Sequence, residues 1–241
     1  MGEPPSQRAW FDVAFGEVYD LLYEHRDDED AANDIERVLE RGLGSRARIG
    51  DLACGNGRHL EALAARRVDL RAVGIDRSAH LLGLARQRLG DGARLARGDL
   101  RALPLASGAL DVALNLFTSF GYFDTDAEHE LAATEMRRVL APRGWLHMDH
   151  VDAAVLAANL TPESHVERGG RSVQMTRRIE DGRVKKRIRS SDGAIDHEES
   201  VRLWTPAEMQ LLLEGAGFEV EDIELRDGRM HVWANRAGGS R

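Results

Sequence analysis

The fold is decided at residues 51–57, which read Asp-Leu-Ala-Cys-Gly-Asn-Gly between a strand-like run at 47–50 and a helix-like segment at 58–64. Two glycines spaced by one residue after a strand let bare backbone approach a ligand at the carboxyl edge of a sheet. Leu60 stands where a dinucleotide fingerprint needs a third small residue. Asp51 would repel a phosphate and suits a cationic or amine-bearing ligand. The stretch therefore predicts a nucleotide-like cofactor and argues against NAD.

Strand and helix signals alternate around this loop, from residue 46 to residue 151. The alternation predicts βαβ units and a mostly parallel sheet. Ser78 is placed to cap one helix, and Pro142 stands where another must end. We expect strands near 47–53, 70–76, 93–98, 110–117 and 145–151, and helices near 58–67, 78–89 and 126–140.

The pattern changes beyond residue 160, where turn signals separate alternating runs that predict an antiparallel β flap. The runs lie around 171–179, 183–190 and 196–204. Thr205 and Pro206 then start a helix, and a closing hairpin is expected over 218–225 and 230–235. We predict one domain with four parts: an N-terminal lid (1–45), a cofactor-binding core (46–155), a β flap insertion (160–204) and a closing helix and hairpin (205–236).

Three motifs at successive strand ends carry a family resemblance. Residues 51–57 resemble the first motif of class I S-adenosylmethionine-dependent methyltransferases, whose loop wraps the amino acid part of the cofactor. Asp76 ends the next strand, where a carboxylate accepts hydrogen bonds from both ribose hydroxyls. Asp99 and Leu100 look like the family's adenine contact, with Asp99 accepting from the exocyclic amine and Leu100 offering its backbone.

The resemblance implies both a fold and a cofactor, S-adenosyl-L-methionine. The fold is α/β, with a Rossmann-like doubly wound, seven-stranded, mostly parallel sheet that ends in an antiparallel hairpin. An N-terminal helical lid and the inserted antiparallel β flap complete it. In the core, the implied cofactor-binding residues are Asp51, Ala53, Gly55, Gly57, Asp76, Arg77, Asp99, Leu100, Asn115 and Leu116.

Aromatic and apolar residues recur at helical spacing between 10 and 23, which predicts the apolar face of a helix. This helix either packs on the sheet edge or forms a lid whose rings attract a sulfonium cation. Residues 18–26 look like the lid of amino-sugar N-methyltransferases. That resemblance implies that Tyr19 contacts the cofactor, that Tyr23 meets the acceptor and that Arg26 pairs with the cofactor carboxylate. Otherwise Arg26 is an ordinary surface arginine.

Residues 115–123 follow the fourth expected strand and read Asn-Leu-Phe-Thr-Ser-Phe-Gly-Tyr-Phe. The segment lacks the Asn/Asp-Pro-Pro-aromatic motif of DNA adenine methyltransferases and resembles small-molecule enzymes. Phe120 and Tyr122 are candidate substrate-binding residues. Tyr122 either orients the acceptor or is a packed loop tyrosine.

Asp149 and His150 end the fifth expected strand and project to opposite faces, so one of them faces the site. His150 is either a general base, with an ordinary pKa of about 6.5, or a histidine hydrogen-bonded in the loop. A base is optional for a neutral amine acceptor, because alignment and water exclusion supply most of the effect. We therefore expect N-methylation of a small-molecule amine, with O-methylation through His150 as the alternative.

Composition bounds the remaining possibilities. The chain has 241 residues, 42% hydrophobic and 31% charged, without an apolar run of the ~20 residues that a membrane span needs. No secretory signal is visible, and the single Cys54 fits a reducing compartment, so a cytoplasmic monomer or homodimer is expected. The histidines show no metal-ligand spacing, so no metal is predicted.

A net charge of −8 argues against broad nucleic-acid binding. The segment 168–189 is the exception, because it carries nine basic residues against Glu180 and Asp181. It predicts either the solvated face of a hairpin or a patch that meets an anionic substrate. An RNA-directed methyltransferase using this flap, or a cofactor-binding protein without transferase activity, stays open as an alternative. The identity of the acceptor and the pathway cannot be read from these patterns.

Overall fold

The computed structural model describes residues 28–67, 69–168 and 170–238, and its main feature is a seven-stranded sheet. The strand order is β10-β11-β5-β4-β1-β2-β3. Strands β3, β2, β1, β4 and β5 pair in parallel, whereas β11 pairs antiparallel with both β5 and β10. The strands are β1 (Arg48–Leu52), β2 (Arg71–Asp76), β3 (Leu95–Arg97), β4 (Leu110–Asn115), β5 (Leu140–Val151), β10 (Phe218–Arg226) and β11 (Arg229–Arg236). The predicted parallel sheet with a closing hairpin is confirmed.

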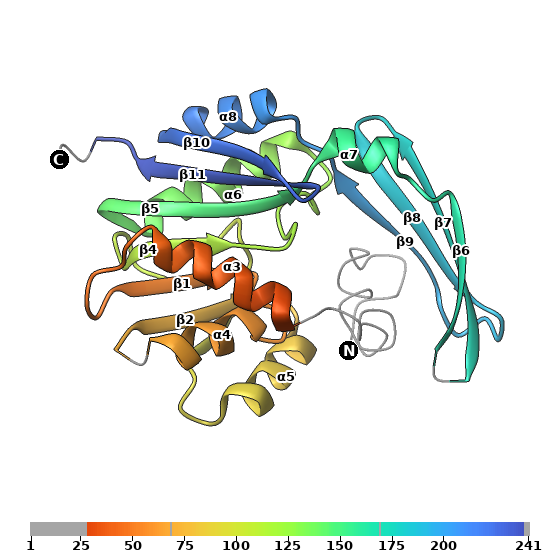
Figure 1. Cartoon of the computed structure of the whole chain (residues 1–241), viewed down its shortest axis with the longest axis horizontal. Helices are drawn as coiled ribbons and strands as arrows, with labels where there is room; N and C mark the ends of the chain where they lie inside the picture. Colours follow the sequence, from red (N-terminus) through yellow and green to blue (C-terminus); the bar gives the residue numbers. More distant parts are fainter. Residues whose placement is uncertain (1–27, 68, 169, 239–241) are drawn as a thin grey trace.

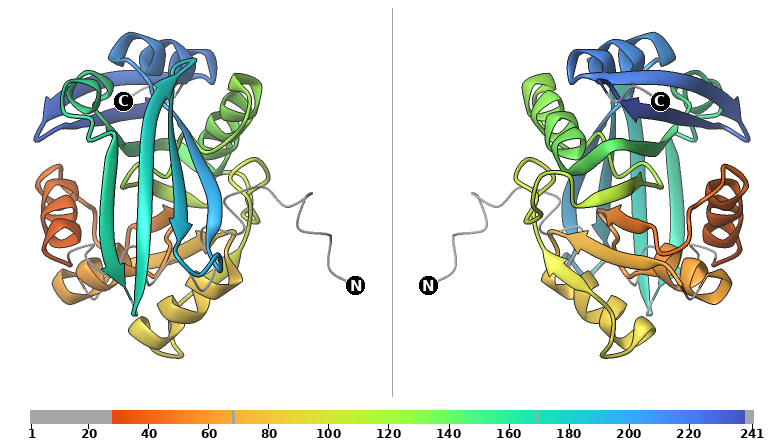
Figure 2. Two further views of the ribbon diagram at one scale, coloured as in Figure 1. Left: turned by 90° about the vertical axis from the view of Figure 1, so that its right-hand side faces the viewer. Right: turned by 90° about the vertical axis from the view of Figure 1, so that its left-hand side faces the viewer.

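Helices cover both faces of this sheet (Figures 1 and 2). On one face, α3 and α4 bury Ile35, Val38 and Leu63 against β1 and β4. On the other face, α6 and α8 bury Met136 and Leu213 in the larger core cluster. The helices are α3 (Asp28–Glu40), α4 (Arg58–Arg66), α5 (Ala79–Leu89), α6 (Asp126–Val139), α7 (Ala153–Ala158) and α8 (Pro206–Gly215).

The expected helix boundaries follow from capping. Ser78 Oγ accepts from Leu81 N at 3.1 Å at the start of α5, as predicted. Thr205 forms a reciprocal capping box with Glu208 at the start of α8, and Pro206 occupies the first turn. Sequence analysis did not foresee α3, α7 or β6.

A second, four-stranded antiparallel sheet makes up the flap, in the order β6-β7-β8-β9. Its strands are β6 (Glu163–Arg168), β7 (Arg171–Glu180), β8 (Arg183–Ser190) and β9 (Asp196–Arg202). Figure 1 shows this sheet at the right, beside the edge at which the parallel strands end. The flap therefore stands next to the part of the core where a cofactor pocket is expected.

Candidate functional site

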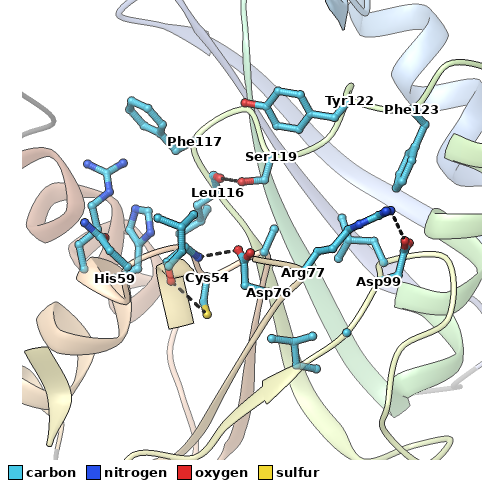
Figure 3. A pocket seen from close by; sticks show the side chains of 18 residues that line it. Cys54, His59, Asp76, Arg77, Asp99, Leu116, Phe117, Ser119, Tyr122 and Phe123 are labelled. Atoms are coloured by element: carbon cyan, nitrogen blue, oxygen red, sulfur yellow. Dashed lines mark hydrogen bonds and ion pairs between the residues drawn. The ribbon is translucent and has the colours of Figure 1, made fainter. Parts of the chain in front are cut away.

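A pocket opens at the carboxyl edge of the parallel strands (Figure 3). Its empty volume is about 910 Å³, open mouth included, within the range of small-molecule sites. The walls come from the loops after β1, β2, β3 and β4 and from the start of α4. The lining residues are Ala53, Cys54, Gly55, Asn56, Arg58, His59, Ile75, Asp76, Arg77, Leu81, Gly98, Asp99, Leu100, Leu116, Phe117, Ser119, Tyr122 and Phe123.

The loop after β1 lies against the end of β2. Ala53 N and Cys54 N both donate to Ile75 O, at 2.7 and 3.0 Å. Gly57 has a left-handed backbone with φ of 80°, and a Cβ there would lie 3.1 Å from Ala85 Cβ in α5. Gly57 thus permits helix packing and is absent from the pocket lining, whereas Ala53 and Gly55 belong to it.

Asp51 is 1% exposed at the end of β1, and its Oδ2 has no hydrogen-bond partner among the described residues. Burial raises the pKa of Asp51 to about 6, and the carboxylate of Asp76 adds to the rise. A buried oxygen that lacks a donor is costly unless a ligand supplies one. Asp51 therefore offers a buried carboxylate oxygen as a hydrogen-bond acceptor for a ligand. Asp51 itself is not among the pocket-lining residues.

Asp76 lines the pocket and organises the glycine loop. Its Oδ2 accepts from Gly55 N at 2.8 Å, and its Oδ1 accepts from Ser78 N at 2.8 Å. Burial raises the pKa of Asp76, and these backbone bonds oppose the rise only in part. Each carboxylate oxygen keeps acceptor capacity, so Asp76 has room for further donors.

Asp99 lies at the other end of the pocket, next to Arg77 (Figure 3). It accepts from Arg77 Nη1 at 2.9 Å, from Arg101 Nε and Nη2 at 2.9 and 2.7 Å, and from Arg101 N at 2.9 Å. Burial raises the pKa of Asp99, but Arg101 and Arg77 together lower it below its usual range. Four donors fill the about four acceptor positions of a carboxylate. Asp99 would have to release one of them to accept an adenine amine.

The end of β4 forms the opposite wall. Asn115 is fully buried and donates its Nδ2 to Leu52 O at 2.7 Å, which joins β4 to β1. Asn115 is not among the pocket-lining residues, whereas Leu116 and Leu100 both are. Ser119 Oγ donates to Leu116 O at 2.7 Å and closes the turn that follows β4.

The two candidate substrate-binding residues of this loop have different surroundings. Tyr122 lines the pocket, and Figure 3 shows its ring at the upper wall. Phe120 is 0% exposed and packs against His129 and Trp204, with ring centroids 5.1 and 6.1 Å apart. Phe120 is a core residue in this structure, because the turn directs its ring away from the pocket.

The structure places His150 beneath the loop and not in the pocket wall. The side chain is fully buried, and its Nδ1 lies 3.0 Å from Val151 O. Burial lowers the pKa of His150 to about 4. The other member of the pair, Asp149, is the one that contacts a pocket-lining residue, because its Oδ2 accepts from Phe117 N at 3.1 Å. This geometry favours the second interpretation, a histidine hydrogen-bonded beneath the loop, and the role of His150 as a general base stays a prediction.

Sequence analysis missed part of the lining. Arg58 is 7% exposed and places its guanidinium 4.2 Å from the ring centre of Phe117. His59 Nε2 lies 3.2 Å from Asp34 Oδ2, which ties α4 to α3. The sequence did carry a signal for these two residues. Arg58 and His59 directly follow the glycine loop, so they lie in the first turn of α4, next to the pocket.

Three predicted residues, Tyr19, Tyr23 and Arg26, lie outside the described residues, as does the expected helix between 10 and 23. Within the described ranges, no three His, Cys, Asp or Glu side chains are grouped as a metal site requires. None of the described helices is long and apolar enough to cross a membrane.

The basic flap segment is largely neutralised by carboxylates of the same sheet. Lys186 pairs with Glu199 at 3.3 Å, and Arg178 pairs with Glu198 at 2.8 Å. Three further cations, Arg187, Arg189 and Lys185, pair with Asp196 or Glu180. This agrees with the solvated-face interpretation of the segment.

Comparison with known proteins gives a consistent result. Residues 49–144 match the family model of a methyltransferase domain. The chain is 28% identical over 232 residues to a dTDP-3-amino-3,4,6-trideoxy-alpha-D-glucopyranose N,N-dimethyltransferase from Streptomyces venezuelae, covering 89% of this chain and 94% of that protein. A dTDP-3-amino-3,6-dideoxy-alpha-D-glucopyranose N,N-dimethyltransferase from Streptomyces fradiae is 29% identical over 221 residues, covering 85% of this chain and 84% of that protein.

Solved structures agree with these relatives. SAM-bound CalS10, an amino pentose methyltransferase from Micromonospora echinaspora, superposes with a TM-score of 0.67 at 26% identity, covering 92% of this chain and 97% of that one. DesVI from Streptomyces venezuelae gives a TM-score of 0.68 at 26% identity, covering 92% of this chain and 98% of that one.

The donor and acceptor set of the pocket fits S-adenosylmethionine. The buried Oδ2 of Asp51, which no described residue contacts by a hydrogen bond, matches the need of an ammonium group for an acceptor. Asp76 has capacity for hydroxyl donors beside the glycine loop, and Leu100 and Leu116 supply apolar walls. Together with the match of residues 49–144 to a methyltransferase domain, these features lead to one conclusion: the chain is an S-adenosylmethionine-dependent methyltransferase.

Proposed function

We propose that the enzyme methylates the amine of a small-molecule acceptor, an amino sugar carried by a nucleotide. Two relatives that align over 85–89% of this chain are named as N,N-dimethyltransferases of dTDP-linked amino sugars, and this observation carries the proposal. S-adenosylmethionine supplies an electrophilic methyl group on a sulfonium when it is bound. The pocket at the carboxyl edge of the sheet, with an empty volume of about 910 Å³, supplies the space for the cofactor.

The proposed cofactor contacts follow from the residues around the pocket. We assign Asp51 to the ammonium group, Asp76 to the ribose hydroxyls and Asp99 with Leu100 to the adenine edge. Arg77 would regulate access to Asp99, because it holds one acceptor position of that carboxylate. The remaining contacts are proposed for Ala53, Gly55, Leu116, Tyr19 and Arg26.

On the acceptor side, Tyr122 and Tyr23 are the residues we propose to orient the sugar. A neutral amine already presents a lone pair, so alignment and exclusion of water supply most of the catalytic effect. The burial of His150 weighs against the O-methyltransferase alternative, since that reaction would need a base in contact with the acceptor hydroxyl.

An RNA-directed enzyme is supported less well by the flap. Such an enzyme needs cations that are available to phosphates, and most cations of β7 and β8 pair with neighbouring carboxylates. No described contact favours this alternative over a small acceptor.

The test is an acceptor comparison with the purified enzyme. We expect methyl transfer to a dTDP-linked 3-amino sugar, followed by mass spectrometry as one or two added methyl groups. The matched sugar with a hydroxyl in place of the amine should remain unmethylated. Transfer to the hydroxyl sugar, or to RNA with no transfer to the amine, would refute the proposal.

A Tyr122→Phe variant tests the role of the tyrosine in the same assay. If the hydroxyl orients the acceptor, the acceptor KM should rise by about tenfold, corresponding to one lost hydrogen bond, while affinity for S-adenosylhomocysteine stays unchanged. An unchanged KM would make Tyr122 a packing residue of the loop.

A further inference from the structure

The turn after β4 has an unusual backbone. Phe117 and Thr118 have φ angles of 58° and 59°, in the left-handed region that favours glycine. Phe117 is bulky and Thr118 is β-branched, so neither residue adopts this conformation without strain. Phe117 also lines the pocket, and Figure 3 shows its ring at the upper wall. Strain of this kind persists only where surrounding contacts hold it in place.

Asp149 provides the first of these contacts. It is fully buried on β5, and its Oδ2 accepts from Phe117 N at 3.1 Å. Its backbone carbonyl accepts from Thr118 N at 2.9 Å. One residue therefore binds the amide groups of both strained positions.

Arg229, on β11, provides the second contact. Its Nε donates to Asp149 Oδ1 at 2.5 Å, and its Nη2 donates to Thr118 Oγ1 at 3.1 Å. The same guanidinium lies 4.9 Å from the ring centre of Phe117, and the guanidinium of Arg58 lies 4.2 Å from it. Both distances are within the range of cation–π attraction. Asp149 and Arg229 therefore fix the backbone of the turn, and Arg229 and Arg58 contact the ring of Phe117.

We propose that Asp149 and Arg229 are positioning residues that hold Phe117 against the cofactor pocket. Neither side chain lines the pocket, so they act through the turn that they stabilise. Without the ion pair, the two left-handed residues relax toward ordinary backbone angles, and the ring leaves the pocket wall. The inference rests on the methyltransferase assignment and does not depend on which acceptor is used.

The test compares two aspartate substitutions by calorimetric titration with S-adenosylhomocysteine. Asp149→Asn keeps the shape of the side chain but presents an amide to Arg229, and it should weaken binding by about tenfold or more. Asp111→Asn is the matched control. Asp111 pairs with Arg48 at 2.6 Å at the opposite end of β4, far from the pocket loop. Both variants should melt at a lower temperature than the wild type, because each loses an ion pair. Only Asp111→Asn should keep the wild-type affinity for S-adenosylhomocysteine.

Two further variants separate positioning from general stability. Arg229→Lys keeps the charge but loses the fork that joins Asp149 to Thr118, and it should weaken binding as Asp149→Asn does. Adding Thr118→Gly to Asp149→Asn removes strain at one position and should recover part of the lost affinity. The proposal fails if Asp149→Asn and Asp111→Asn bind equally well, or if Thr118→Gly gives no recovery while Asp149→Asn is folded by circular dichroism.

Discussion

Asp51 is the residue at which stability and function oppose each other. Its burial raises its pKa to about 6, well above the ordinary value of an aspartate, so between the two values the folded chain holds a proton more tightly than the unfolded chain. The ionised carboxylate therefore weakens the fold above about pH 6. This loss of stability is tolerated because the same charge is the proposed acceptor for the cofactor ammonium.

We expect Asp51→Asn to raise the free energy of unfolding without ligand by roughly 1–3 kcal/mol at pH 8. The gain should disappear near pH 4, because Asp51 is then neutral in the folded protein too. The same variant should bind S-adenosylhomocysteine more weakly. Urea unfolding at both pH values and a binding titration check both effects. A variant that is destabilised at pH 8 would show that Asp51 is already satisfied in the fold.

Other residue-level outcomes show where sequence reasoning stops. Asp76 and Asp99 could be located because they match family motifs that follow successive strands, and the ends of parallel strands meet at one sheet edge. Asp149 and His150 also lie at such an end, but alternation says only that they face opposite ways. Which of the two side chains contacts the pocket loop depends on the left-handed turn at Phe117 and Thr118. No residue pattern predicts this turn, because neither position is a glycine.

At the scale of elements, the flap and the core meet at Gly121. Gly121 O accepts from Arg202 N at 2.8 Å and from Arg183 Nη2 at 3.3 Å, and Arg183 also donates to Phe123 O at 2.9 Å. The residues on both sides of Tyr122 are thus bound to the flap. The position of the flap and the position of Tyr122 are linked through this loop.

A Gly121→Ala substitution should break this link. Its φ is 133°, and a Cβ would lie 2.9 Å from Val201 Cγ1 and 3.1 Å from His150 Nε2. We expect a loss of about 2–4 kcal/mol in unfolding free energy and a higher acceptor KM. Gly193→Ala, in a flap turn with φ of 73° and open space around it, should cost only about 1–2 kcal/mol and leave KM unchanged. Equal effects of the two substitutions on KM would show that the loop is independent of the flap.

The helices and strands predicted most accurately are those rich in apolar residues. The five parallel strands and α4, α5, α6 and α8 formed near the expected ranges, because their periodicity and caps are strong. The helix α3 was missed because its sequence is mostly charged and it buries only Ala31, Ile35 and Val38. Those three residues have helical spacing, so the signal was present but weak. The strand β6 has no such pattern and is defined by its pairing with β7.

For the whole molecule, buried histidines contribute to the dependence of stability on pH. His147 is fully buried and stacks on Trp233 at 3.7 Å, and burial lowers its pKa to about 3. Burial lowers the pKa of His150 to about 4. Histidines of this kind bind protons more readily in the unfolded chain, so their stability contribution is complete above about pH 6.5 and is lost as the pH falls. Protonation of Asp51 below pH 6 has the opposite effect and stabilises the fold, but it involves only one group.

We therefore expect His147, His150 and Asp51 together to lower the free energy of unfolding by about 3 kcal/mol between pH 7.5 and pH 5. Each of the two histidines loses about 2 kcal/mol at pH 5, and protonation of Asp51 returns about 1 kcal/mol. Urea unfolding at constant ionic strength measures the difference. His147→Phe should reduce the loss by about 2 kcal/mol, whereas His165→Gln, an exposed position on β6, should leave it unchanged. If wild-type stability is equal at the two pH values, these histidines accept protons without unfolding, and their burial does not control the acid limit of the enzyme.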